Sequence, residues 1–445
     1  MAIISFFSLG FLFFLLPLTV LVFAVVPQRY RSFVLVVSTF YFFATVSPLF
    51  LLVMCGSVLT DYLLSRFILP GGAGGRRSKL LLWLVAAKNI LLVVTFSVGS
   101  QLLPGKIIAF GTAVYSFTSL GYLLDLYHDE ADPITGVYDY FVFCCFFGKL
   151  PVGPIVSSRD FAPQLRTMRP SVTKMSEGCV WFCHGLAKKV LLADGVLALG
   201  NQLSAIPYQH KTVLGIWLLI LCYLFSVYFS LSGYSDMARG LGSFFGLNLP
   251  ENFHYPLQSD SITDFFSNFN ISANRFVRKY VYRALGAEDN GAISTAVNIM
   301  LITMLMGVWY GISLNFLMWG AILGVVIVFE TLMGDRLHRV PVPVRRLVTL
   351  CLLVVSFAVF CSGTLSQAWF YLHIMFGFGN VPLFDHQALY LLSSNLVLLL
   401  CCALFSTSFL SRRGRMLQHR WPLVASLFSL LSNAVIFVVS IAFLV

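Results

Sequence analysis

Charged residues are scarce in this chain: 11% of its 445 residues are Asp, Glu, Lys or Arg, against about 25% in a soluble globular domain. Hydrophobic residues make up 58% of the sequence, and the mean hydropathy is +0.87. No polar stretch is long enough to form a soluble domain of ordinary size. Apolar runs of about 20 residues, long enough to cross ~30 Å of hydrocarbon, recur from end to end. The composition therefore predicts a single integral membrane domain over residues 1–445.

Acidic residues are the scarcer of the charged types, with 18 Asp and Glu against 29 Lys and Arg and a net charge of +11. The basic residues are dispersed over short segments between apolar runs, so they form no single stripe that would bind nucleic acid. The positive-inside rule assigns most of these segments to the cytoplasm. The first apolar run lacks a basic n-region and is too long for a signal peptide, which predicts a retained span. With Arg29 and Arg31 inside, the N-terminus is expected outside.

The cysteines lack the spacing of a metal or disulfide framework. None of the ten forms a CxxC pair, and most lie within apolar runs, so we expect no metal site and small buried hydrophobic side chains. A nucleophilic role for Cys144 or Cys145 is disfavoured, because no local base is evident that would generate a thiolate.

The apolar pattern predicts an all-α polytopic membrane protein with about ten or eleven transmembrane helices. The run 33–67 is too long for one span, and Pro48 divides it into two helices. The segment from 128 to about 212 is mixed in polarity and is predicted to be re-entrant or interfacial, covered by protein or water. The other candidate spans are 1–26, 80–102, 107–127, 213–232, 292–310, 312–333, 347–362, 388–410 and 422–444.

The least apolar part of the chain contains an acidic residue close to an apolar run. Asp236 has Arg239 three positions later, on the same helical face, where the two side chains can pair. An ionisable residue at membrane depth is a candidate functional residue. A structural ion pair that closes the end of a span is an equal alternative.

Residues 265–280 read FFSNFNISANRFVRKY, with aromatic residues at mostly helical spacing. This pattern predicts a helix that lies in the headgroup layer or dips inward from it. Arg275, Arg278 and Lys279 cluster at its far end, on the expected cytoplasmic donor side, and could hold an anionic lipid or a phosphorylated acyl donor. Basic side chains that only extend their charges to the membrane–water interface explain the cluster equally well.

Several stretches in order along the chain carry a family resemblance. They read FGTAVYSFTSLGYLLDLYHDE, FFGKLPVGPIVSSRDFAPQL, GLAKKVLLAD, SGYSDMARGLGSFFGLNLPENFHYPL, SITDFFSNFNISANRFVRKYVYRALG and LMGVWYGISLNFLMWG, with a weaker VSFAVFCSGTLSQAWFYLHIMFG. Together they resemble the membrane-bound O-acyltransferase (MBOAT) family, in its bacterial branch of alginate O-acetyltransferase and the teichoic-acid D-alanyl transfer protein. The resemblance places an MBOAT-like core at about 107–377.

The resemblance implies a fold and a set of partners. Family members form a ring of membrane helices around a central tunnel, in which a cytoplasmic acyl donor meets an acceptor from the other side. The bacterial branch implies the plasma (inner) membrane and transfer of a short, acetyl-like group to extracytoplasmic polysaccharide. No cofactor is expected, because acetyl-CoA or an acyl carrier protein would be a substrate. The implied partners are membrane lipid, the polysaccharide, an SGNH-type acyltransferase and a cytoplasmic acyl carrier, with no nucleic acid.

The sequence departs from the family where the chemistry is expected. Residues 309–311 read WYG in place of W-H-G, so Tyr310 stands at the position of the catalytic histidine. Residues 269–272 read FNIS in place of W-H-I-S, so Asn270 replaces a second histidine. The family's F-R-A-like element appears at 360–362 as FCS, without its arginine.

These replacements remove the usual proton acceptors. An acceptor hydroxyl needs a base as it attacks an acyl group, and histidine suits this with a pKa of ~6.5. A tyrosine with a reference pKa of ~10 stays protonated, and asparagine does not titrate. Tyr310 can still stabilise an oxyanion through its O–H group. His254, close to the polar part of the chain, is the best substitute base, although a structural role is the more common one for such a residue.

Two main hypotheses follow. The first is an acyltransferase with Tyr310 and Asn270 at the catalytic positions. The second is a catalytically inert family member that acts as a scaffold, an acyl or lipid conduit, or a docking platform. A secondary transporter is disfavoured, because no inverted repeat is apparent. The residues predicted to line the tunnel are Asp236, His254, Ser272, Trp309 and Asn315.

Overall fold

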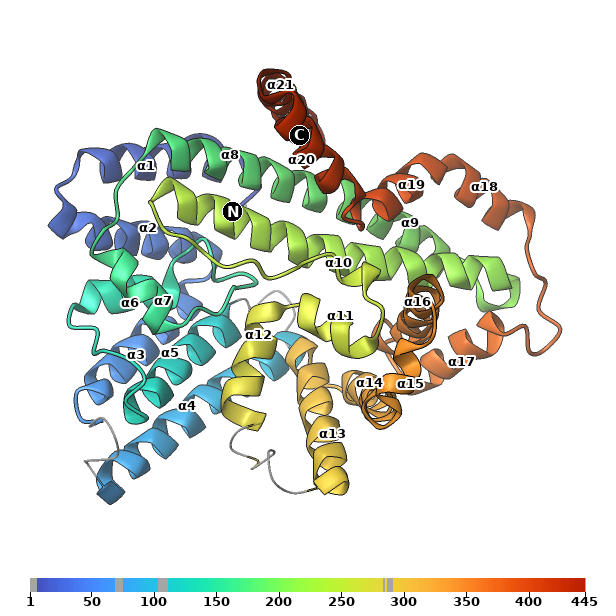
Figure 1. Ribbon diagram of the computed structural model, residues 1–445, viewed down its shortest axis with the longest axis horizontal. Helices are drawn as coiled ribbons and strands as arrows, with labels where there is room; N and C mark the ends of the chain where they lie inside the picture. Colours follow the sequence, from blue (N-terminus) through green and yellow to red (C-terminus); the bar gives the residue numbers. More distant parts are fainter. Residues whose placement is uncertain (1–5, 69–74, 103–110, 283–284, 286–290, 445) are drawn as a thin grey trace. The chain divides into compact units, whose positions relative to one another are not determined.

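The computed structural model describes residues 6–68, 75–102, 111–282, 285 and 291–444 (Figure 1). Throughout these residues the regular structure is helical, apart from an isolated antiparallel bridge between Phe253 and Phe269. The predicted all-α class is therefore confirmed. The chain divides into two compact units, which alternate along the sequence. The predicted single domain is not tested by this division and stays a prediction.

Unit 1 comprises Met1–Gly185 and Tyr234–Asn252. The helices that begin in it are η1 (Phe11–Leu15), α1 (Leu16–Val25), η2 (Gln28–Tyr30), α2 (Arg31–Val46), α3 (Pro48–Ser65), α4 (Gly75–Leu102), α5 (Thr112–Tyr127), α6 (Val137–Cys145), α7 (Ser158–Leu165) and α8 (Val172–Ala187).

Unit 2 comprises Leu186–Gly233 and Phe253–Phe443. The helices that begin in it are η4 (Lys188–Ala193), α9 (Asp194–Ala205), η5 (Tyr208–His210), α10 (Val213–Phe244), η6 (Pro256–Gln258), α11 (Ile262–Asn268), α12 (Ile271–Phe276), η7 (Val277–Tyr282), α13 (Gly291–Tyr310), α14 (Leu314–Met333), α15 (Asp335–His338), α16 (Val342–Phe360), α17 (Leu365–Met375), α18 (His386–Ser394), α19 (Leu396–Phe405), α20 (Phe409–Arg420) and α21 (Pro422–Ala442).

The multi-pass membrane character is also confirmed. Among the described residues, seven helices are long and apolar enough to cross a membrane, and the bent pair α18 and α19 makes an eighth if it is one span. The seven are α3, α4, α10, α13, α14, α16 and α21. Every other predicted span also contains a described helix, but α1, α2 and α5 are only 10 to 16 residues long.

The predicted division of residues 33–67 at Pro48 is confirmed. Helix α2 ends where Ser47 adopts an extended conformation, with φ −160° and ψ 106°. The Ser47 hydroxyl then accepts a hydrogen bond from the Phe50 N–H at 3.3 Å and caps α3. Pro48 takes the first helical position, where its missing N–H has no cost. The Ser47–Pro48 pair thus divides one apolar run into two helices.

Helices α13 and α14 pack backbone against backbone through glycines. A Cβ atom on Gly307 would lie 2.1 Å from the carbonyl oxygen of Phe316, and one on Gly320 would lie 2.3 Å from that of Thr303. Small residues let membrane helices approach this closely without a side chain between them. The contact fixes the last turn of α13, which ends at Tyr310.

The predicted continuous helix over residues 265–280 is wrong. The chain forms α11, breaks at Phe269 and Asn270, and then forms α12 and η7. Asn270 adopts the left-handed conformation, with φ 53° and ψ 54°, which asparagine tolerates better than most residues. The extended Phe269 pairs with Phe253, and the His254 N–H donates to the Asn268 carbonyl at 2.9 Å. This pairing replaces the helical hydrogen bonds at the break.

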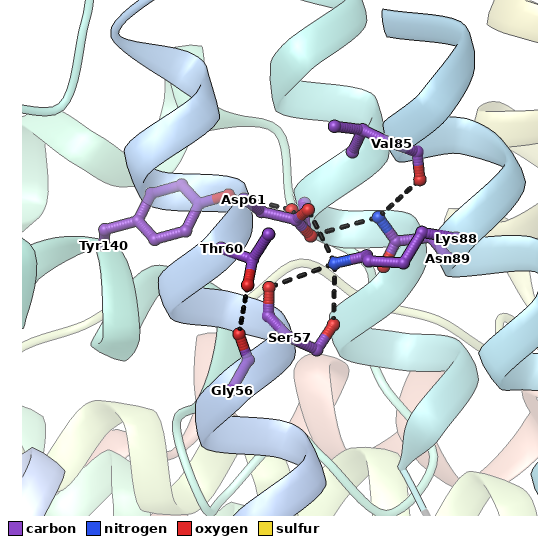
Figure 2. Close-up of polar contacts among 9 residues, drawn as sticks. Gly56, Ser57, Thr60, Asp61, Val85, Lys88, Asn89 and Tyr140 are labelled. Carbon is purple, nitrogen blue, oxygen red and sulfur yellow. Dashed lines mark hydrogen bonds and ion pairs between the residues drawn. The ribbon is translucent and has the colours of Figure 1, made fainter. Parts of the chain in front are cut away.

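An ion pair with a buried carboxylate and a partly exposed lysine joins two helices of unit 1, and sequence reasoning did not single it out (Figure 2). The Lys88 ammonium of α4 lies 2.6 Å from Oδ1 of Asp61 on α3. It also donates to the carbonyl and the hydroxyl of Ser57, at 3.0 and 2.9 Å. All three ammonium donors therefore have an acceptor.

The carboxylate of Asp61 is fully buried and bonded on both oxygens. Its second oxygen accepts from the Asn89 amide at 3.0 Å and from the Ser119 hydroxyl of α5 at 2.8 Å. The Ser119 hydroxyl is in turn 2.8 Å from the phenol of Tyr140 on α6. Four helices of unit 1 thus meet in one polar network (Figure 2).

Candidate functional site

The segment that carries Asn270 is fixed at its beginning by a carboxylate from α14. One oxygen of Glu330 accepts from the Ile262 N–H at 2.7 Å, and the other accepts from the Thr263 N–H and hydroxyl at 2.9 and 2.6 Å. These N–H groups belong to the first turn of α11, where a negative charge is favourable. The Ser261 hydroxyl caps the next N–H, that of Asp264, at 2.9 Å. Helix α11 therefore has a defined position against α14.

An ion pair just before α11 fixes the same segment to α16. Oδ2 of Asp260 lies 2.8 Å from Nη2 of Arg345. The hydrogen bonds to Glu330 and this ion pair together set the course of the chain toward Asn270.

Glu330→Gln is expected to lower the stability of the protein by about 1.5–3 kcal/mol, the usual worth of hydrogen bonds to a charged group. The amide places an N–H group opposite one of the α11 donors, so at least one hydrogen bond is lost. Thermal unfolding of the detergent-solubilised protein measures the change. Glu177→Gln is the control, because Glu177 is exposed and forms no ion pair among the described residues. Equal midpoints for the two variants would contradict this role of Glu330.

Tyr310 lies in an aromatic box in unit 2. Its ring centroid lies 5.5 Å from that of Phe360, 5.9 Å from that of Trp319 and 6.3 Å from that of Phe269. The contacts with Phe360 and Trp319 are edge-to-face, a favoured geometry for aromatic pairs. Four different segments of the chain supply these rings, so the position of Tyr310 is set by tertiary packing.

The box encloses a small cavity of about 10 Å³, roughly the room that one water molecule needs. Its walls are apolar and mostly aromatic. The lining residues are Leu224, Val227, Tyr228, Phe265, Phe269, Tyr310, Trp319, Leu353, Phe357 and Phe360.

Two polar atoms of the lining residues are buried, the hydroxyl oxygen of Tyr310 and Nε1 of Trp319. The side chain of Asn270, itself only 5% exposed, lies close enough to act on the Tyr310 hydroxyl. Nε1 of Trp319 has no hydrogen-bond partner among the described residues. The phenol O–H and the indole N–H are both hydrogen-bond donors. This arrangement can bind a carbonyl oxygen or a water, but it offers no group suited to removing a proton from an alcohol.

The structure therefore brings together the two residues predicted at the catalytic positions, Tyr310 and Asn270. It does not place the proposed substitute base beside them. His254 is exposed, and it is not among the residues that line the cavity. The catalytic roles of these residues stay predictions.

The other predicted tunnel residues of unit 2 lie outside the cavity wall. Ser272 is buried in α12, and Trp309 is half-buried in α13. Asn315 is buried, and its amide donates to the Ser362 carbonyl at 2.6 Å. That bond ties the start of α14 to the FCS element, so a structural contact accounts for the polarity of Asn315.

Asp236 belongs to unit 1, at the end of α10 that lies in that unit. Its predicted pairing with Arg239 is present as a loose contact of 4.0 Å between Oδ1 and Nη1. The Arg239 guanidinium also stacks on the Trp181 ring at 3.8 Å, a cation–π contact. The functional role of Asp236 and its structural alternative both stay predictions.

The basic residues predicted for the donor side follow the break at Asn270. Arg275 and Arg278 are exposed, and Lys279 is half-buried with its ammonium 5.1 Å from the Tyr280 ring centroid. Their exposure is compatible with binding an anion and equally with a solvated interface.

Neither a thiol nor a metal supplies an evident alternative chemistry. Burial raises the pKa of the Cys144 thiol to about 12, so no thiolate forms near neutral pH. Within the described ranges, no three His, Cys, Asp or Glu side chains lie close enough to share a metal ion.

Sequence reasoning missed most of the cavity wall and the carboxylate that positions α11. Trp319 lies within one of the quoted family stretches, but nothing in its spacing distinguishes it from other aromatic residues in spans. Glu330 carried a usable signal, since it is the only acidic residue in the otherwise apolar segment 312–333.

Comparison with known proteins gives a consistent result. The family model described as MBOAT, membrane-bound O-acyltransferase family, matches residues 29–373. Probable alginate O-acetylase AlgI of Pseudomonas aeruginosa is 31% identical over 390 residues, which cover 83% of this chain and 74% of that protein. Peptidoglycan O-acetyltransferase of Helicobacter pylori is 32% identical over 195 residues, 42% of this chain and 36% of that protein. Teichoic acid D-alanyltransferase of Bacillus subtilis is 26% identical over 163 residues, 35% and 41% of the two chains.

Proposed function

The chain belongs to the membrane-bound O-acyltransferase family, and from this premise we propose that it serves in O-acylation of an extracytoplasmic polysaccharide without base-catalysed transfer of its own. In this role the chain keeps the fold of its relatives and acts as a membrane scaffold or acyl-binding component beside a competent enzyme. Relatives named for O-acetylation of alginate and peptidoglycan support the process.

The cavity around Tyr310 carries the proposal. None of its ten lining residues is a histidine or a carboxylate, and the phenol that replaces the imidazole is a hydrogen-bond donor where the family has a base. General-base assistance is typically worth ~10²–10⁴-fold in rate, so its loss removes most of the turnover that a relative would have.

A second candidate function is supported by the same two donors. The O–H of Tyr310 and the N–H of Trp319, which has no hydrogen-bond partner among the described residues, are suited to holding the carbonyl oxygen of an acyl donor. In an active enzyme they would stabilise the oxyanion of the tetrahedral intermediate, for which one donor is worth about 10²–10³-fold in rate. The acceptor would then have to lose its proton to water or to a group on a partner.

The experiment compares acetyl transfer by the purified full chain in lipid nanodiscs, with labelled acetyl-CoA as donor and alginate oligosaccharides as acceptor. The wild-type protein and Tyr310→Phe are both expected to consume donor at the rate of empty nanodiscs. Tyr390→Phe is the matched control, because Tyr390 is exposed on α18. Wild-type turnover that falls about 10²-fold in Tyr310→Phe alone would overturn the proposal and establish the second candidate.

The same family setting suggests a location and partners. We place the chain in a bacterial plasma (inner) membrane with its N-terminus outside, on the strength of the basic residues Arg29 and Arg31 at the other end of the first span. The acyl donor, acetyl-CoA or an acyl carrier protein, would approach on the side of Arg275, Arg278 and Lys279. The extracytoplasmic partners would be the polysaccharide and an SGNH-type acyltransferase.

A further inference from the structure

Helices α2, α3 and α6 of unit 1 pack against one another (Figure 1). An open apolar groove is lined by residues of these three helices. It encloses about 310 Å³, within the usual range of small-ligand pockets. The residues that line it are Val36, Phe40, Cys55, Gly56, Leu59, Val137, Tyr138 and Phe141. Of these, Tyr138 alone carries a strongly polar side-chain group, so the groove suits a hydrocarbon ligand.

A glycine gives the groove its depth. Gly56 is exposed, and a Cβ atom added to it would meet no other atom within 4 Å. The neighbouring Cys55 and Leu59 face the same space, one turn apart on α3. Unfilled apolar space forfeits dispersion contacts, and in a membrane the molecules that can fill it are lipids.

The groove lies against the middle of α2, and the cationic end of that helix lies on one side of it. Val36 and Phe40 are roughly 10 and 16 Å along the helix from Arg29, at 1.5 Å per residue. Between Arg29 and the groove, the Phe33 ring packs edge-to-face on the lining residue Tyr138, with centroids 5.3 Å apart. The larger of the two distances, about 16 Å, is half of the ~30 Å hydrocarbon thickness, the depth of one leaflet.

Arg29 offers a charge that the protein does not neutralise. It is exposed, its guanidinium stacks on the Tyr30 ring at 4.6 Å, and it forms no ion pair among the described residues. Arg66, at the C-terminal end of α3, adds a second positive charge, although it donates to the Thr135 carbonyl at 2.6 Å. Guanidinium groups are well suited to binding phosphate oxygens.

We propose that this groove binds one acyl chain of an anionic glycerophospholipid, whose phosphate is held at Arg29. Such a ligand has an apolar chain that fills the groove and a phosphate that pairs with the arginine. It therefore covers the apolar surface of the groove and neutralises the charge of Arg29. A helix of a partner protein fits less well, because it is about 10 Å across and roughly three turns of it would need several times the volume of the groove.

The test uses the full chain in nanodiscs of phosphatidylcholine with a small fraction of phosphatidylglycerol that carries a diazirine on its acyl chain. After irradiation, crosslinked peptides are identified by mass spectrometry. Crosslinks are expected to concentrate on α2 and α3 relative to α21, most of whose surface faces outward. Equal crosslinking of these helices would overturn the proposal.

Two substitutions examine the two ends of the ligand separately. Gly56→Leu fills the groove and is expected to lower crosslinking about tenfold, the worth of roughly two buried methylene groups. Gly10→Leu is its control, because Gly10 is also exposed with open space around it.

Arg29→Gln is expected to abolish the preference for phosphatidylglycerol over phosphatidylcholine, whereas Arg413→Gln on the exposed α20 is not. A dimer that Gly56→Leu converts to a monomer would assign the groove to a second copy and overturn the proposal.

Discussion

Lys88→Met is expected to destabilise the protein by about 3–5 kcal/mol, the usual cost of leaving a buried charge without its partner. Asp61 has no solvent exposure, and the lysine is its only cationic partner in the network of Figure 2. Methionine matches the lysine stem in length, so the loss of packing is small. The remaining Asn89 and Ser119 donors are neutral and cannot balance a carboxylate between membrane helices.

The double variant Asp61→Asn/Lys88→Met tests the assignment of this loss to charge. It removes both charges and keeps the shape of the network, so it is expected to recover most of the stability of the wild type. Unfolding of all variants in the same detergent, followed by fluorescence, gives the comparison. Lys79→Met, on the exposed start of α4, serves as the control for losing a lysine. A Lys88→Met midpoint equal to that of Lys79→Met would refute the network's contribution.

The sequence could not have paired these two residues. Asp61 and Lys88 are 27 positions apart on different helices, and each stands alone in an apolar run. Hydropathy finds the runs because membrane thickness fixes their length. It does not say which faces of the runs meet. The break at Pro48 was predictable, since both the proline and the preceding serine act locally on the backbone.

The candidate site likewise combines features that the sequence predicts with contacts between distant residues that it does not predict. The structure places the Asn270 side chain within reach of the Tyr310 hydroxyl, and the catalytic roles that the family motifs assign to both residues stay predictions. The left-handed conformation of Asn270 was not anticipated, because aromatic residues keep helical spacing on both sides of it. The helix breaks where Phe269 forms a backbone bridge with Phe253, a pairing that the local sequence does not predict. The aromatic wall around Phe357 was also unpredictable, since every face of a membrane helix is apolar.

Gly320→Ala is expected to destabilise unit 2 by more than about 3 kcal/mol, beyond the usual cost of overpacking. The added Cβ would lie 2.3 Å from the Thr303 carbonyl oxygen and 2.8 Å from the Met304 Cα. Both are backbone atoms, so no side-chain rotation relieves the overlap and α13 must move as a whole. Since α13 ends at Tyr310, the aromatic box would be displaced with it.

Two comparison variants separate this clash from the general effect of adding a methyl group. At Gly324 the close neighbours are side-chain atoms, the Thr303 hydroxyl at 2.3 Å and the Met300 sulfur at 2.9 Å, so Gly324→Ala is expected to cost less. At Gly363 the nearest atom lies 3.5 Å away, an ordinary contact, and Gly363→Ala is expected to be close to neutral. The order of thermal midpoints should therefore place Gly320→Ala lowest and Gly363→Ala highest. If Gly320→Ala unfolds with Gly363→Ala instead, α13 and α14 do not pack backbone to backbone, and Tyr310 is not held by that contact.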